Sequence, residues 1–229
     1  MNHGTLPSLL QLASQTLPVG AFSYSQGLEW AVAAGIVGNQ SQAEEWIGVV
    51  LESGIAAWDA TWVAASMRAL SAAAYGDLAT LNERFLASRE TRELRAETVQ
   101  TGKAMLDLLR DGDALDREAL RFLERLDDGD GLAYPIAWAA AAAAHGIAVD
   151  AAVIGYLWSW VENQVLAALK CVPLGQRAGQ RLLNRLGARL ESLASQATAR
   201  HPDDCRNLLP GHSLASMCHE TQYTRLFRS

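Results

Sequence analysis

The chain has 229 residues, of which 50% are hydrophobic, and its formal net charge is −6 at pH 7. A chain of this length can bury one sizeable core, and its negative charge gives no electrostatic support for binding the phosphate backbone of a nucleic acid. Ala and Leu dominate the apolar residues. Both are strong helix formers, so the composition favours an all-α fold.

Capping residues and helical spacing predict a series of helices along the first half of the chain. Ser23 with Gln26 fits a capping box, and so does Ser41 with Glu44, which begins an apolar pattern that continues to about Leu70. Further helices are expected from Asp77, from Thr91 to about Arg110, and from Asp113 to Leu126.

The second half of the chain continues the helical pattern. Pro135 suits the first turn of an Ala-rich helix that Gly146 closes. Asp150 can cap the next helix, which Pro173 terminates because proline cannot continue a helix. A further helix is expected over 175–198. No segment alternates with period two, so strands are not indicated.

The most apolar region, residues 136–169, raises the question of a membrane span. His145, Gly146 and Asp150 interrupt it, so that it lacks the uninterrupted run of about 20 apolar residues that a spanning helix needs. Three cysteines without regular spacing do not form a disulfide framework, and no charged-then-apolar leader opens the chain. The sequence therefore predicts a cytoplasmic protein that does not associate with membranes.

The pattern predicts one helical bundle of roughly eight to ten helices, since helices that are apolar around much of their surface must be buried among others. The bundle is expected to comprise residues 1–199. Residues 200–229 differ, because they contain loop-forming residues up to Pro210 and a short helical stretch from Ser213. We expect them to form a mobile C-terminal tail.

The sequence carries no recognisable catalytic motif. The nearest approach to a phosphate-binding loop, Gly102–Lys103, is followed by Ala104 and has Glu97 in place of the first glycine. Neither a zinc-protease motif nor a nucleophile elbow is present. The absence of such motifs favours a protein that acts by binding other proteins.

Histidine and cysteine are concentrated near the C-terminus, where five of the eight such residues lie after residue 200. Imidazole and thiolate groups suit zinc, copper or nickel. Their intervals do not match a known ligand spacing, so chance clustering is favoured over a metal site. The candidate ligands are His201, Cys205, His212, Cys218 and His219.

Several segments in order along the chain together resemble the urease accessory protein F family, UreF. These segments are Leu17–Glu29, Ser88–Arg95, Tyr134–Pro135 with the Ala-rich helix after it, Leu169–Gln176 with Gln180, and His219–Ser229. The first and last are the most specific. Residues 36–84 and 105–132 match only as helical segments.

The resemblance implies an all-α homodimer that has no enzymatic activity and binds no cofactor tightly. It implies a complex with the UreD (UreH) scaffold and the GTPase UreG, in which the protein bridges these partners and regulates GTP hydrolysis and nickel transfer into apo-urease. Nickel would pass through the complex. The GTPase partner would then supply the nucleotide chemistry that this sequence lacks.

The matched segments single out residues for partner binding. The tail is expected to order against the UreD-type partner and to place Arg225 near Tyr24. Lys170 has two interpretations, a contact with the GTPase or a cation that complements a helix C-terminus. The full set is Tyr24, Ser25, Glu29, Lys170, Pro173, Gln176, His219, Glu220, Tyr223, Arg225, Leu226, Phe227 and Arg228.

Two other function classes remain alternatives. One is a metal-binding chaperone that uses the histidine and cysteine residues of its own tail. The other is a bundle enzyme with an unrecognised site, which would need titratable groups that converge in a pocket.

Overall fold

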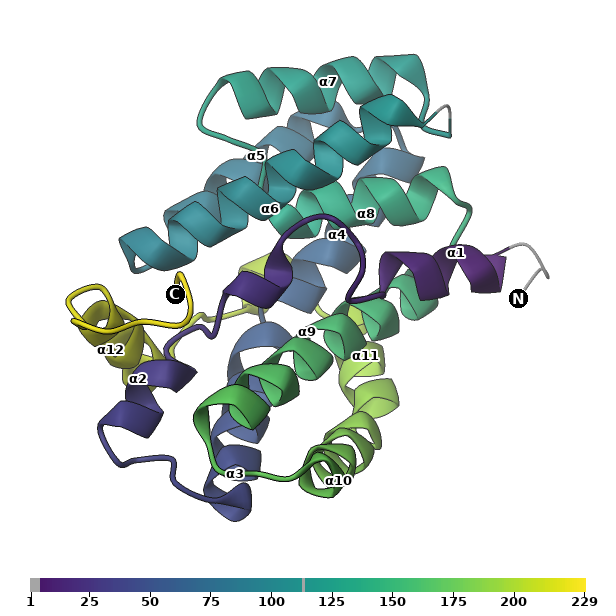
Figure 1. The fold of residues 1–229 in the computed structure, drawn as a ribbon. Coiled ribbons are helices and arrows are strands. Elements are labelled where there is room, and N and C mark those ends of the chain that lie inside the picture. The colour runs from purple at the N-terminus through teal and green to yellow at the C-terminus, as the bar shows by residue number, and fades with distance from the viewer. Residues whose placement is uncertain (1–4, 113) are drawn as a thin grey trace.

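The computed structural model describes residues 5–112 and 114–229 and confirms the all-α fold. Over this part of the chain there are twelve α-helices and no strands (Figure 1). The α-helices are α1 (Thr5–Leu12), α2 (Leu28–Ala33), α3 (Gln40–Val50), α4 (Asp59–Ser71), α5 (Tyr75–Ala87), α6 (Arg92–Asp111), α7 (Arg117–Asp128), α8 (Tyr134–Ala144), α9 (Val149–Cys171), α10 (Gln176–Gly187), α11 (Leu190–Ala199) and α12 (Pro210–His219). Two 3₁₀ turns (Ala21–Ser23 and Pro202–Asp204) and one π turn (Leu51–Ile55) lie between them.

Two of the helices expected from the sequence are each divided in the structure. The apolar pattern that continues to Leu70 is interrupted by the π turn Leu51–Ile55, so that α3 and α4 are separate helices. The expected helix over 175–198 divides into α10 and α11. In each case the apolar residues of the sequence continue at helical spacing across the division, so the sequence pattern alone did not reveal where the helix is divided.

Some of the expected helix boundaries are confirmed. The side chain of Thr91 accepts a hydrogen bond from the Leu94 amide and caps α6. Pro135 lies in the first turn of α8, and α9 ends at Cys171, just before Pro173.

Other expected boundaries are wrong. Ser23 does not cap a helix, because Gln26 and Gly27 take positive φ values of 51° and 81° and α2 begins only after them. Asn39, not Ser41, caps α3. Asp77 and Asp150 lie within the first turns of α5 and α9 instead of capping them. Asp113 lies outside the described residues, and α7 begins at Arg117.

The Ala-rich helix α8 lies at the centre of one half of the molecule. It packs mainly against α4 and α6, and every residue from Pro135 to Ala142 is buried. Alanine side chains are short, so they let neighbouring helix backbones approach closely. The same close approach requires Gly102 on α6, where a Cβ atom would collide with the backbone of Leu132 and Tyr134 just before and within the start of α8.

The long helix α9 connects this half of the molecule to the other. It packs against α10, α11 and α4, and also against α2. In Figure 1, α5 to α8 form the upper part of the molecule, and α3, α10 and α11 form the lower part beside α9. The fold is therefore one continuous helical assembly with α9 running through it.

The C-terminal tail, which the sequence predicts to be mobile, is docked on the core in the structure. Helix α12 packs against α2 and α6. The segment after α12 returns along residues 23–29, so that the C-terminal residues and the segment before α2 lie side by side (Figure 1). The structure thus joins the first and last family-like segments into one region.

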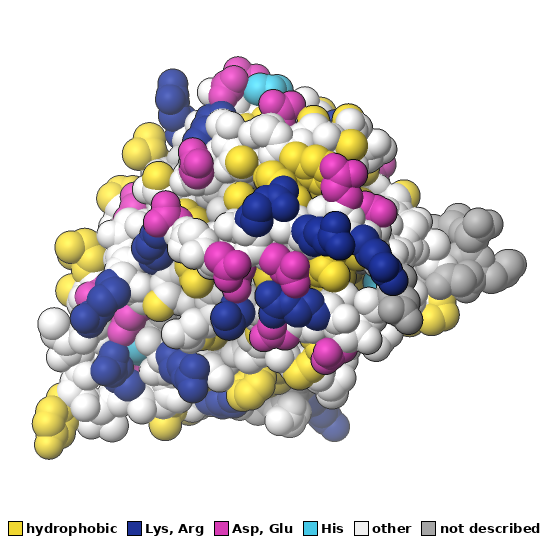
Figure 2. Space-filling model, turned by 90° about the horizontal axis from the view of Figure 1, so that it is seen from above, with side chains coloured by type: hydrophobic (Ala, Val, Ile, Leu, Met, Phe, Trp, Pro, Cys, Tyr) yellow, Lys and Arg dark blue, Asp and Glu magenta, His cyan; other side chains and the backbone are white. Residues whose placement is uncertain are grey.

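Two observations bear on the charge of one face and on the apolar character of the helices. Figure 2 looks down on the face that includes α7 and shows Lys and Arg interspersed with Asp and Glu, without a continuous basic patch. Within the described part of the chain, no helix is both long enough and apolar enough to cross a bilayer.

The close contact between α6 and α8 can be tested by adding one methyl group. We expect Gly102→Ala to lower the free energy of unfolding by about 2 kcal/mol or more, because a Cβ atom there meets backbone that cannot move aside. Urea unfolding followed by circular dichroism measures the change. The matched control is Gly76→Ala on α5, where a Cβ atom has open space. The free energy of unfolding of that variant should be unchanged or higher by up to about 1 kcal/mol. Equal effects of the two substitutions would contradict this account of the contact.

Candidate partner-binding site

The last residues of the chain form backbone hydrogen bonds with the segment before α2. The amides of Ser25 and Gln26 donate to the carbonyl oxygen of Ser229 at 2.7 and 3.1 Å. The Arg228 amide donates to the carbonyl oxygen of Ser23 at 2.8 Å, and the Ser25 hydroxyl donates to Ser229 at 2.6 Å. This pairing fixes the position of the tail against the core.

The local conformation before α2 makes room for this pairing. Gly27 has a φ of 81°, which glycine adopts without steric cost. A Cβ atom there would stand 3.0 Å from the amide nitrogen of Ser216, so glycine also allows α12 to approach. The side chain of Gln26 accepts from the Trp160 indole at 2.8 Å and donates to Glu97 at 2.7 Å, which holds the turn in place.

The carboxylate of Glu29 receives the tail. It is 7% exposed, and it accepts hydrogen bonds from the backbone amides of Leu226 and Phe227 at 2.7 and 3.0 Å. Nε2 of His219 lies 3.2 Å from the same carboxylate. A buried carboxylate is costly unless its oxygens are satisfied, so the two amide donors and the contact with the His219 ring stabilise Glu29 in its buried position.

A second carboxylate, that of Glu93, completes the arrangement. It lies 2.7 Å from Nδ1 of His219 and accepts from the Arg225 guanidinium at 2.8 Å. Glu29, Glu93, His219 and Arg225 therefore form one connected cluster, which we call the tail latch. His219 at its centre has no exposed surface.

The N-terminus of α6 supports the tail latch. Glu93 lies in the first turn of α6, where the helix dipole favours a negative charge. The carboxylate of Glu220 accepts from the amides of Arg92 and Glu93 at 2.9 and 3.3 Å, so that the tail caps α6. Because the charges of the tail latch are paired and hydrogen-bonded, removal of one partner would leave another charge buried alone.

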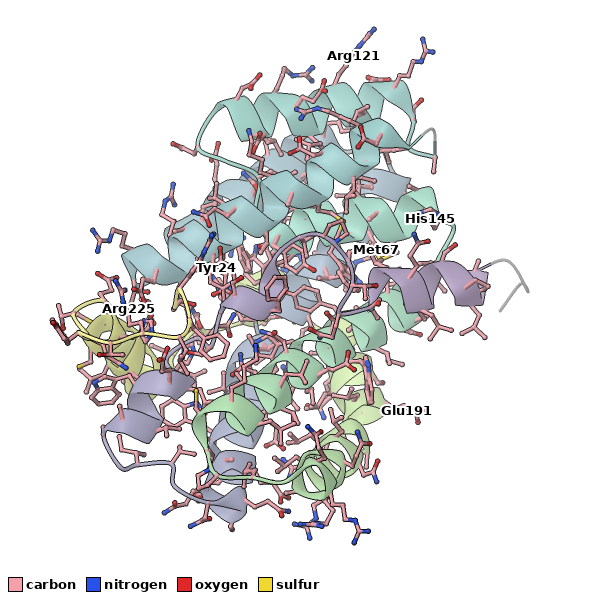
Figure 3. All side chains as sticks on the ribbon, in the orientation of Figure 1. Tyr24, Met67, Arg121, His145, Glu191 and Arg225 are labelled. Carbon is pink, nitrogen blue, oxygen red and sulfur yellow. The ribbon has the colours of Figure 1, made fainter. Side chains whose placement is uncertain are left out.

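Tyr24 and Arg225 are not in contact as expected. Tyr24 is buried, and its hydroxyl donates to Gln100 at 2.6 Å. Arg225 instead pairs with Glu93, and the arginine beside Tyr24 is Arg228. Figure 3 labels Tyr24 and Arg225, which stand apart in that view. Burial raises the pKa of Tyr24, and Arg228 partly opposes that increase. The expectation placed the right segments together but assigned the wrong arginine.

The docked tail leaves an apolar and basic surface facing outward. Phe22 and Leu226 are 54% and 71% exposed. They line a hollow of about 420 Å³ with Ser23, Lys170, Phe227 and Arg228. Nζ of Lys170 lies 5.2 Å from the centre of the Phe227 ring, a cation–π contact that joins the end of α9 to the tail. We call this region the outer tail surface.

The other predicted residues lie at the edge of this site or away from it. Tyr223 is fully exposed. Pro173 lies in the turn between α9 and α10, and Gln176 is the first residue of α10. No interaction joins either residue to the tail in the described part of the structure. The residue set predicted from the sequence therefore includes Glu29, His219 and Arg225 of the tail latch but also residues that lie outside this site.

The candidate metal ligands do not converge. Cys205 donates to the carbonyl oxygen of His201, and His201 lies beside Asp203. Burial lowers the pKa of His212 to about 4, and both ring nitrogens of His219 face carboxylates. Cys218 is half-buried. Among the described residues, no group of three His, Cys, Asp or Glu side chains could hold a metal ion.

The residues that sequence reasoning missed are buried acidic groups and their partners. Glu93 lies in Ser88–Arg95, one of the segments that resemble the UreF family. Its position in the first turn of a helix was the signal that could have indicated its role. Glu97 lines a small cavity of about 50 Å³, where burial raises its pKa to about 7. Asp59 pairs with Arg89 at 2.9 Å, with both side chains about nine-tenths buried. Asp59 and Arg89 lie 30 residues apart, so no local pattern links them.

The role of Glu29 in docking the tail can be tested by neutralising it. In Glu29→Gln, a side-chain amide replaces a carboxylate that accepts from the Leu226 and Phe227 amides through two different oxygens, so one of these buried donors loses its acceptor. We expect trypsin to cleave after Arg225 about 10- to 100-fold faster, equivalent to ~1.4–3 kcal/mol of docking free energy. Mass spectrometry measures the cleavage, and circular dichroism monitors the core. The control is Glu83→Gln at an exposed position on α5. Cleavage as slow as in the unaltered chain would contradict the role of Glu29.

Comparisons with known proteins agree with the resemblance. The model of the UreF family matches residues 37–187, which is more than half of the chain. Urease accessory protein UreF of Azoarcus sp. (strain BH72) is 54% identical, with 99% of this chain and 97% of the relative covered. The protein of the same name from Dechloromonas aromatica (strain RCB) is 50% identical, with 98% and 97% covered.

Similarity extends to more distant relatives over nearly the same length. Urease accessory protein UreF of Ectopseudomonas mendocina (strain ymp) is 44% identical, with 97% of this chain and 98% of the relative covered. UreF accessory proteins are non-catalytic chaperones, which accounts for the lack of a catalytic motif. The similarity over the whole length, together with the family match, shows that the chain belongs to the UreF family.

Proposed function

We propose that this protein is a urease accessory protein required for nickel insertion into apo-urease. It bridges the UreD (UreH) scaffold and the UreG GTPase, and it regulates GTP hydrolysis and nickel transfer. Family membership supports this role, since the similar proteins are named urease accessory protein UreF. Nickel is then cargo that passes through the complex, not a resident cofactor.

The observation that carries this proposal is the outer tail surface. Exposed apolar side chains rimmed by basic groups suit a protein partner, because the apolar groups supply burial and the charges supply orientation. Phe22 and Leu226 come from opposite ends of the chain but lie on the same hollow. We propose that the UreD-type scaffold binds there, and that residues 200–229 act as the partner-binding tail of a core formed by residues 1–199.

Lys170 supports a link between the outer tail surface and the region that we propose contacts UreG. Its position in the last turn of α9 suits the helix dipole, and its contact with the Phe227 ring also ties it to the tail. We propose that Lys170 transmits the docking of the tail to the region that contacts UreG. The proposal also includes a homodimer in the cytoplasm, as the family resemblance implies.

The alternative of a metal-binding chaperone receives no support from the described residues. Its proposed ligands are dispersed, and His219 is engaged with two carboxylates. No observation favours that alternative over the scaffold role.

The experiment that tests the proposed function is co-purification with UreD (UreH) and GTP-loaded UreG. We expect the doubly substituted variant Phe22→Ala/Leu226→Ala to recover at least tenfold less scaffold, because both side chains are exposed and their loss removes apolar contact area. Leu10→Ala on α1 is the control, since Leu10 is 64% exposed and does not line the hollow. It should recover the scaffold normally.

Two outcomes would contradict the proposal at different levels. Failure of the unaltered chain to bind the scaffold would reject the assigned role. Normal binding by the doubly substituted variant would retain the role but reject the outer tail surface as the docking site.

A further inference from the structure

A small cavity lies between the link from α5 to α6 and the segment that leads into α12. It has a volume of about 20 Å³, and Arg89 and His212 are among the residues that line it. Nε of Arg89 and Nε2 of His212 are both buried, and neither has a hydrogen-bond partner among the described residues. Buried polar atoms are almost always hydrogen-bonded, so two such nitrogens on one cavity indicate a site for a polar ligand.

The two nitrogens have complementary hydrogen-bonding roles. The guanidinium of Arg89 keeps all its protons, so its Nε can only donate. Burial lowers the pKa of His212 to about 4, so its ring is neutral at pH 7 and carries one proton. A hydrogen bond with the backbone of Gln26 opposes that decrease, as a carbonyl oxygen does when it accepts from a ring N–H. Because Nε2 has no partner, we place this proton on Nδ1, which leaves Nε2 as an acceptor.

We propose that this cavity binds one ordered water molecule, which accepts a hydrogen bond from Nε of Arg89 and donates one to Nε2 of His212. A water molecule needs a cavity of at least about 10–15 Å³ and two to four polar partners. Asp59, Glu90 and Asn207 also line the cavity and supply acceptors for the second proton of the water. The two carboxylates disfavour an anion in this place, and the charge of Arg89 disfavours a cation.

The water completes the attachment of the chain to the core ahead of α12. The side chain of Asn207 donates to the carbonyl oxygen of Ser88 at 3.1 Å, and the Ser213 hydroxyl donates to Glu90. Between these two direct contacts, the guanidinium and the imidazole are joined only through the water. This attachment is separate from the tail latch, and it does not depend on the identity of any partner.

A crystal structure of the full chain, at a resolution that shows ordered water, tests the site directly. We expect one water oxygen within about 2.7–3.2 Å of both Nε of Arg89 and Nε2 of His212. A cavity without water, or a water that reaches only one of the two nitrogens, overturns the inference. Proton–nitrogen NMR of the same chain at pH 7 locates the proton on the ring. We expect it on Nδ1, and a proton on Nε2 overturns the proposed bridge.

Two substitutions of His212 separate its bridging nitrogen from the other side of the ring. The side-chain amide of asparagine reaches the place of Nδ1, and that of glutamine reaches the place of Nε2. We expect trypsin to cleave after the exposed Arg206 at least tenfold faster in His212→Asn than in the unaltered chain, because the water loses an acceptor. Cleavage of His212→Gln should be at least threefold slower than that of His212→Asn.

The control is His145→Asn, at an exposed position at the end of α8, which should be cleaved at the rate of the unaltered chain. Equal cleavage of the two His212 variants, or faster cleavage of His212→Gln, overturns the water bridge. The crystal structure and the NMR measurement use the unaltered chain, so they decide the inference even if neither variant folds.

Discussion

The carboxylate of Glu29 is the constraint on which the arrangement of this site depends. A buried negative charge must be paired and hydrogen-bonded, and every partner of this one comes from the last eleven residues of the chain: the ring of His219 and the amides of Leu226 and Phe227. The Leu226 amide lies 197 positions away in the sequence. The cost of burying Glu29 is therefore offset only when the two ends of the chain meet.

The helical core supplies the rigid frame that this meeting requires. Helix α8 is buried between α4 and α6, and Gly102 lets α6 and the backbone before α8 come into close contact. Those contacts fix the direction of α6, whose first turn carries Glu93. Small side chains in the core thus determine where the second carboxylate of the tail latch stands, although they take no part in binding.

In a member of a family of non-catalytic chaperones, the buried charged cluster has a structural role and is not an active site. In an enzyme, converging carboxylates and a histidine suggest acid–base chemistry. Here both ring nitrogens of His219 are occupied by protein carboxylates, so the cluster organises the chain itself. What it presents to the outside is a shaped surface with Phe22, Leu226 and Lys170 around one hollow.

The sequence by itself determined the helical class, several helix boundaries and the family, because alanine and leucine content, caps and prolines act locally. Thr91 and Pro173 are positions where a local rule decided the structure. Only the tertiary structure decided that the tail is docked, that Arg225 pairs with Glu93 rather than with Tyr24, and that Glu29 is buried. These facts depend on contacts between residues more than a hundred positions apart, for which the spacing along a chain carries no signal.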